Sequence, residues 1–153
     1  MYFSIEQFSN ALRLDGVPGA LKYLNRGVDH RYTSISRLDG LDFVNAGLYD
    51  KAGQQIPATF SYTPVHASFC QFVLRDGAFR TNDSSLDTRL AGHPYQGVMM
   101  AYHGVPVKNA QGDLYGTLCH FDLVQRPLPD AEFELLQQAA TLLAPYLARE
   151  NTP

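Results

Sequence analysis

The chain has 153 residues, about the size of one domain, and 45% of them are hydrophobic, which is enough for a core without crosslinks. Twelve basic and 15 acidic residues give a net charge of −3, which argues against binding nucleic acid or an anionic membrane by neutralising phosphates. The sequence shows no secretory signal, no apolar run long enough to span a membrane and only two cysteines. We therefore expect a cytoplasmic protein with two thiols rather than a disulfide.

The N-terminal segment predicts two short helices. Ser4 and Gln7 have the spacing of a capping box, and apolar residues follow at helical spacing until Gly16. The second helix begins with Pro18 at its first position and ends at Gly27.

From His30 the apolar period changes to two, which predicts strands. A β-rich run closes in a turn at residues 38–40, a second strand covers residues 42–49, and residues 50–53 form a hairpin turn. The two strands are therefore expected to pair as neighbours in an antiparallel sheet.

The middle of the chain is less regular. After a break at Thr63-Pro64, the residues His66, Phe69, Cys70 and Val73 fall at helical spacing, and the helix should end at Gly77. Residues 78–81 predict a short strand. Residues 82–96 predict a polar loop with at most one helical turn, and long loops of this kind often bind ligands.

The last third predicts a hairpin followed by a helix. The strands cover residues 97–107 and 114–122, and the helix runs from about residue 129 to residue 149 with a bend at Pro145. Asp122, at the end of its strand, should accept backbone hydrogen bonds near Arg126. The apolar arc of the helix is wider than one packing face needs, so it serves either a dimer or two internal contacts.

This order of elements predicts an α+β fold. An antiparallel sheet carries the N- and C-terminal helices on one face. The irregular segment of residues 63–96 covers the other face and forms a ligand pocket with it.

Several short motifs follow one another at characteristic spacing. They are Ser68-Phe69-Cys70, Thr81-Asn82-Asp83, Ala101-Tyr102-His103-Gly104-Val105-Pro106-Val107, Gly112, Gly116-Thr117-Leu118-Cys119-His120-Phe121-Asp122, Arg126-Pro127 and Glu134-Leu135-Leu136. Together they resemble the bacterial GAF domain pattern. The resemblance covers residues 18–148, behind a helical extension of residues 1–17, in a chain expected to be one GAF-like domain.

The resemblance implies a sheet of about six strands and a pocket for a small molecule. GAF domains commonly sense cyclic nucleotides, tetrapyrroles, haem, nitrate or amino-acid-derived metabolites, and they usually precede an output domain. No output domain is recognisable in the 153 residues, so we expect a sensor that signals through a separate protein partner. Related sensors dimerise through their terminal helices, which makes a homodimer plausible here. The ligand and any cofactor stay unknown.

The candidate ligand-binding residues combine charge, hydrogen-bond donors and aromatic faces, the mixture that fixes a small polar ligand. Arg89 could pair with a carboxylate or nitro-oxyanion. Alternatively, Asp83 and Asp87 only cap turns and Arg89 is solvated. The full set is Phe69, Cys70, Asp83, Asp87, Arg89, Tyr95 and Tyr102.

The two cysteines carry an alternative function. Free methionine-R-sulfoxide reductases are GAF proteins that use cysteine chemistry in this pocket, so Cys70 and Cys119 are the candidate catalytic residues of a reductase acting on a small oxidised metabolite. The cysteine pattern around the loop differs from the one we associate with that family. Cys119 is otherwise a small buried apolar residue.

Cofactor attachment has little support in the sequence. Cys119-His120 is similar to the bilin-binding Cys-His pair, but strand alternation sends the two side chains to opposite faces. His66 and Cys70 would share a helix face, yet two ligands do not make a metal site, so no metal is expected. None of the five histidines is singled out as a haem ligand.

Overall fold

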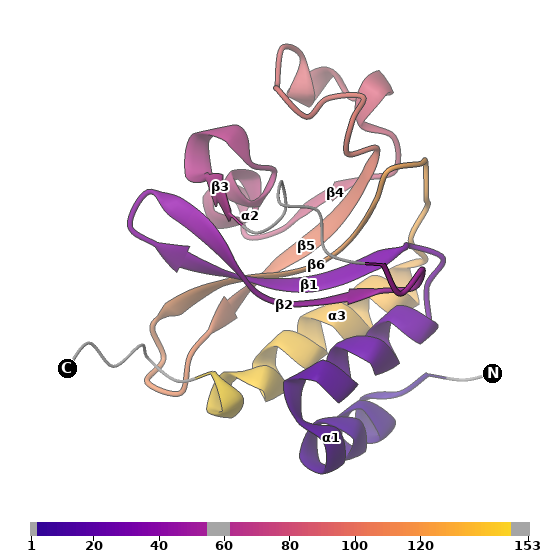
Figure 1. Cartoon of the computed structure of the whole chain (residues 1–153), viewed down its shortest axis with the longest axis vertical. Coiled ribbons are helices and arrows are strands. Elements are labelled where there is room, and N and C mark those ends of the chain that lie inside the picture. The colour runs from indigo at the N-terminus through magenta and orange to yellow at the C-terminus, as the bar shows by residue number, and fades with distance from the viewer. Residues whose placement is uncertain (1–2, 55–61, 148–153) are drawn as a thin grey trace.

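A computed structural model describes residues 3–54 and 62–147 of the chain (Figure 1). Within these residues six strands form one antiparallel sheet in the order β3-β2-β1-β6-β5-β4, which confirms the predicted α+β fold. The helices are α1 (Ile5–Arg26), α2 (Cys70–Asp76) and α3 (Asp130–Leu143). The strands are β1 (Tyr32–Asp39), β2 (Asp42–Asp50), β3 (Tyr62–Pro64), β4 (Phe79–Thr81), β5 (Ala101–Lys108) and β6 (Leu114–Asp122).

The sheet separates two cores. Helices α1 and α3 lie against one face, and α2 with the segment after β4 lies on the other (Figure 1). Because side chains alternate along a strand, Leu118 on β6 joins the helix-side core while its neighbour Cys119 joins the opposite one. None of the helices in the described ranges is long and apolar enough to cross a bilayer.

Helix α1 contains the predicted break. Gly16 has φ of 71° and ψ of −167°, a conformation that interrupts the helix and favours glycine. The Ser4 side chain accepts from the backbone N–H of Gln7, as a capping box predicts. The return bond runs through a third residue, because the Tyr23 hydroxyl accepts from Ser4 N–H and donates to the Gln7 side chain.

The N-terminal extension belongs to the same core as the rest of the chain. Phe8 and Leu12, which precede residue 17, are 0% and 2% exposed, and both pack in the helix-side cluster. Removing this segment would therefore uncover part of the helix-side core.

The predicted helix over residues 66–73 is wrong in its first half. Residues Val65–Ala67 form a separate 3₁₀ turn after β3, and α2 begins only at Cys70, so His66 and Cys70 do not share a helix face. The end of α2 is as predicted, with Gly77 in the left-handed conformation. The strand predicted from residue 97 begins later, at Ala101, because residues 94–98 form turns.

The polar loop contains two helical turns rather than at most one. The 3₁₀ turns Ser84–Leu86 and Thr88–Leu90 are each capped by the preceding aspartate, whose side chain accepts a backbone N–H two residues ahead. At the C-terminus, α3 ends at Leu143 and a 3₁₀ turn, Ala144–Tyr146, contains the predicted bend at Pro145. Residues 148 and 149 lie outside the described residues.

The wide apolar arc of α3 is largely used inside the monomer. Leu135 and Leu136 are buried in the helix-side core, and Leu142 packs against it. Tyr146, in the turn that follows α3, is 48% exposed. Contacts with the sheet and α1 therefore account for the width of this arc without a dimer. The homodimer through the terminal helices stays a prediction.

Candidate functional site

A cavity of about 60 Å³ lies between the sheet and the residues on its second face. The part of these that follows β4, residues 82–100, is called the covering segment. Strands β1, β2, β5 and β6 supply its floor, α2 supplies one wall, and Tyr95 and Met99 lie over it. Its lining residues are mainly aromatic, aliphatic or uncharged polar: Ser34, Ser36, Phe43, Asn45, Leu48, Thr63, Ser68, Phe69, Cys70, Tyr95, Met99, Tyr102, Cys119 and Phe121.

Hydroxyls and thiols pair with one another at the bottom of the cavity. The Tyr102 hydroxyl donates to Cys70 Sγ at 3.1 Å, and the Thr117 hydroxyl donates to the same sulfur at 3.3 Å. Ser34 Oγ lies 3.3 Å from Cys119 Sγ. Since buried polar groups are costly unless they are paired, this arrangement stabilises a polar floor within an otherwise apolar layer.

Tyr102 reaches the floor because β5 has a glycine two residues later. The tyrosine ring lies over Gly104, where an added Cβ would be 2.7 Å from the Tyr102 hydroxyl oxygen. A contact that short is not tolerated between real atoms, so any larger residue at position 104 would displace the ring. The glycine of the motif Ala101-Tyr102-His103-Gly104 therefore shapes the cavity.

Burial keeps both thiols and the phenol in their neutral forms. It raises the pKa of Cys70 and of Cys119 above the usual thiol range, despite hydrogen bonds that favour the thiolates. The pKa of Tyr102 is also raised, first by burial and then by the neighbouring sulfurs. Cations and helix N-termini lower the pKa of reactive cysteines. Cys70 is the first residue of α2, but burial is the largest influence on its pKa, and no charged side chain lines the cavity among the described residues.

Aromatic rings build the wall beside α2. Phe69 meets the Tyr102 ring edge-on at a centroid distance of 5.8 Å and lies 4.7 Å from the His93 ring. His93 Nδ1 accepts from Tyr95 N–H, so its Nε2–H is free to donate to Ser68 O at 3.1 Å. His93 thus ties the covering segment to the residues just before α2.

The structure divides the predicted site residues into two groups. Phe69, Cys70, Tyr95 and Tyr102 line the cavity together, and so does the alternative catalytic residue Cys119. The loop residues Asp83, Asp87 and Arg89 instead border an open polar cleft on the outside of the covering segment.

The charged loop residues are engaged with one another there. Asp87 Oδ2 lies 2.6 Å from an Arg89 guanidinium nitrogen, and this pair lowers the pKa of Asp87. Arg89 also donates to Arg80 O and stacks over the Phe79 ring at 4.5 Å. Asp83 and Asp87 both cap turns, as the simpler interpretation of the sequence expects.

Sequence reasoning missed the contribution of the first hairpin. Ser34 and Ser36 on β1, and Phe43, Asn45 and Leu48 on β2, line the cavity. The alternation of side chains along β1 could have revealed them, because Ile35 faces the helices and its two serine neighbours face the other way. Serines on a strand that is otherwise buried indicate a polar surface on that face.

Three histidines outside the cavity are completely enclosed on the helix side of the sheet. His103 lies between Asn82 Oδ1 at 2.8 Å and His30 Nε2 at 2.9 Å, and His120 Nδ1 contacts Thr33 Oγ1 at 2.6 Å. Burial lowers the pKa of His30 to about 4 and that of His103 to about 3. In the described ranges, no three His, Cys, Asp or Glu side chains are grouped to hold a metal ion.

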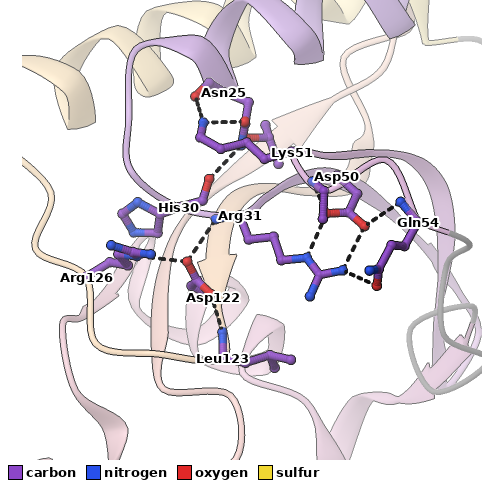
Figure 2. A network of polar contacts seen from close by, with 11 residues as sticks. Asn25, His30, Arg31, Asp50, Lys51, Gln54, Asp122, Leu123 and Arg126 are labelled. Carbon is purple, nitrogen blue, oxygen red and sulfur yellow. Dashed lines mark hydrogen bonds and ion pairs between the residues drawn. The ribbon is translucent and has the colours of Figure 1, made fainter.

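A polar network secures the end of the sheet beside His30 (Figure 2). Asp122, the last residue of β6, accepts from the backbone N–H groups of Arg31 and Leu123 and from Arg126 Nε at 2.9 Å. Arg31 in turn donates two hydrogen bonds to Asp50. The structural role expected for Asp122 is confirmed, because it joins β6 to β1 and to the turn before α3.

The comparisons with known proteins agree with this architecture. The GAF domain model matches residues 17–147. The chain belongs to the GAF domain family. No functionally curated protein matches the sequence.

Solved structures with this fold differ widely in what their names state. The GAF domain of an Acinetobacter phosphoenolpyruvate-protein phosphotransferase has a TM-score of 0.71 and 14% identity, covering 92% of this chain and 87% of that one. Free methionine-R-sulfoxide reductase from Neisseria meningitidis, in complex with its substrate, has a TM-score of 0.70, 13% identity and coverages of 92% and 83%. The phycocyanobilin-bound GAF domain of a cyanobacterial phytochrome has a TM-score of 0.68, 12% identity and coverages of 94% and 93%. At such identities the likeness shows the fold alone.

The chain's own cavity limits which of these ligand types it accommodates. Its volume of about 60 Å³ is well below the roughly 150 Å³ of an engineered cavity that holds a single benzene ring. A tetrapyrrole does not fit this arrangement, and Cys119, which is 2% exposed, has no open approach for bilin attachment.

Proposed function

We propose that this protein is a sensory or regulatory GAF domain of the cytoplasm that binds a small molecule in the cavity between its sheet and the covering segment. The single observation that carries the proposal is the composition of that cavity, in which aromatic walls surround a hydrogen-bonded floor of hydroxyls and thiols. Small-molecule sites are typically lined by apolar and aromatic side chains with a few placed polar groups, which is the composition found here. Two free thiols support a reducing compartment.

The proposed signal leaves through the covering segment. Tyr95 and Met99 lie over the cavity, and the same segment continues into Met100, which bonds to the backbone of Ser84 and Asp122. A ligand that displaces Tyr95 and Met99 would therefore shift the turns after β4, whose outer side includes the exposed Leu86. Binding changes the population of two states only if the ligand prefers one of them, so a partner protein would sense this displaced state.

A screen for thermal stabilisation by small molecules tests the binding function. The wild-type chain is compared with Ser36→Leu, which places a larger side chain into the cavity from β1, and with Arg89→Gln in the outer cleft. Compounds that stabilise the wild-type and Arg89→Gln proteins but not Ser36→Leu support the proposal. A complete absence of stabilising compounds across a metabolite library would overturn it.

A reductase is the second candidate, and the position of both cysteines at one cavity is the observation that favours it. Such an enzyme needs a thiolate that attacks the substrate and a second thiol that resolves the intermediate. The raised pKa of both thiols disfavours the first step. Assay of turnover with free methionine sulfoxide, using the wild-type chain and the Cys70→Ser/Cys119→Ser double variant, separates the two candidates: turnover that depends on the cysteines would favour the enzyme.

A further inference from the structure

We infer that the ligand of this cavity is an uncharged molecule with a small apolar body and one neutral hydrogen-bonding group, held with its body against the floor and its polar group at the mouth. The inference rests on the proposed function and narrows it to a ligand class. It follows from three features of the cavity, which concern charge, the state of the floor, and the unused polar groups near solvent.

The first feature is the charge of the lining. None of the fourteen residues that line the cavity in the described part of the chain is an aspartate, glutamate, lysine, arginine or histidine. The charged loop residues Asp83, Asp87 and Arg89 lie in the outer cleft, and Asp87 and Arg89 already form an ion pair there. A carboxylate, phosphate or ammonium ligand would have to leave water without a counter-charge, which proteins avoid.

The second feature is that the floor already satisfies its own polar groups. Tyr102 and Thr117 donate to Cys70, and Ser34 pairs with Cys119. Within the described residues, the one buried side-chain nitrogen or oxygen that lacks a partner is His30 Nδ1, on the other face of the sheet. The floor therefore needs nothing from a ligand and presents hydroxyl, sulfur and aromatic surface to an apolar group.

The third feature is a pair of polar groups at half-buried positions that have no hydrogen-bond partner among the described residues. Asn45 accepts from Gly47 N–H with its side-chain oxygen, which leaves the side-chain NH₂ group able to donate. The Tyr95 hydroxyl also has no hydrogen-bond partner among the described residues. Both side chains line the cavity and remain partly accessible, so they are placed to meet a polar group at its mouth.

The volume sets the size of the apolar body. The cavity has about 60 Å³, against roughly 150 Å³ for a cavity that holds the six carbons of benzene, which leaves space for about two or three carbons by proportion. A branched amide such as isobutyramide matches this description, with its isopropyl group inside and its amide at the mouth. Larger neutral ligands would have to move Tyr95 and Met99 outward.

The test uses probes that share one shape and differ in charge. Isobutyramide, isobutyrate and isobutylamine are each titrated into the full chain, and backbone amide shifts are followed by NMR. We expect isobutyramide to perturb β1, β5 and β6 residues around the cavity and to bind at least tenfold more tightly than either charged probe. Ser36→Leu should abolish this response and Asn45→Ala should weaken it severalfold, whereas Arg89→Gln should leave it unchanged.

The outcomes separate the inference from the function on which it rests. If isobutyrate or isobutylamine binds the cavity as tightly as the amide, the ligand class is wrong and the binding function stands. Binding of isobutyrate that disappears in Arg89→Gln would overturn the inference in favour of an anion site in the outer cleft. If no probe perturbs the cavity and the metabolite screen also finds no compound, both the inference and the proposed function fail. Should Ser36→Leu not fold, Leu48→Phe at the half-buried edge serves as the blocking variant.

Discussion

Mild acid should destabilise this protein through its buried histidines. His30 and His103 are 0% exposed, and burial lowers their pKa values from 6.5 to about 4 and about 3. Between pH 6.5 and these folded-state values, the unfolded chain binds protons that the folded chain does not. The stabilisation is therefore complete above pH 6.5 and is lost as the pH falls through 6.5 toward the folded-state pKa.

The expected loss is large enough to measure. At pH 5, protonation of a histidine with an unfolded-state pKa of 6.5 favours the unfolded chain by about 2 kcal/mol. Two such residues give about 4 kcal/mol, and His120, whose pKa is also lowered by burial, adds to this. A typical domain has a free energy of unfolding of about 5–15 kcal/mol, so the loss is a substantial part of it.

Urea denaturation at a series of pH values between 7 and 5 measures this effect. Variant His103→Gln removes one titrating group. Its free energy of unfolding should fall by about 2 kcal/mol less than that of the wild type between pH 7 and pH 5. The exposed His66 provides the matched control, so His66→Gln should behave as the wild type. Equal free energies of unfolding at pH 7 and pH 5 would refute this explanation. The same dependence of the free energy of unfolding on pH in both variants would also refute it. Carboxylates with lowered pKa values, such as Asp50, act below this window.

Further predictions concern the cavity and the polar contacts around it. Gly104→Ala should lower the free energy of unfolding by about 1–3 kcal/mol and abolish ligand binding, since its Cβ would displace Tyr102; denaturation and probe titration measure both. Native Cys70 and Cys119 should react with a thiol reagent far more slowly than the urea-unfolded chain, because both are buried with raised pKa values. Asp50→Asn should lower the free energy of unfolding, measured by urea denaturation, by about 1–3 kcal/mol. It replaces a carboxylate that accepts hydrogen bonds from Arg31 and from two backbone N–H groups.

Local signals in the sequence were sufficient for most of the fold. The break at Gly16, the turn after Asp39 and the final hairpin of β5 and β6 all depend on residues close together in the chain, and all three are confirmed. Strand β3 escaped prediction because three residues carry too little periodicity to show it. The false helix at His66 came from apolar spacing that continues across the boundary between a 3₁₀ turn and α2.

The candidate site was harder to predict because it is built from contacts between distant segments. Tyr102 and Cys70 were predicted from their motifs, but the pairing of Ser34 with Cys119 depends on the register of β1 against β6. Charge was a misleading guide to the cavity. Asp87 and Arg89 look like ligand contacts in the sequence, yet they pair with each other at the outer cleft, where the Arg89 side chain is exposed to solvent.

Strand β5 shows how the sheet separates stability from binding. Tyr102 and His103 are adjacent, and alternation sends the first into the cavity floor and the second into the buried histidines behind the sheet. The proposed ligand contact therefore involves one face of the strand, while the buried histidines occupy the other. Backbone hydrogen bonds join each central strand to its neighbours, so the cavity lies on a rigid support, and the covering segment with Tyr95 and Met99 is left as the part that can respond to a ligand.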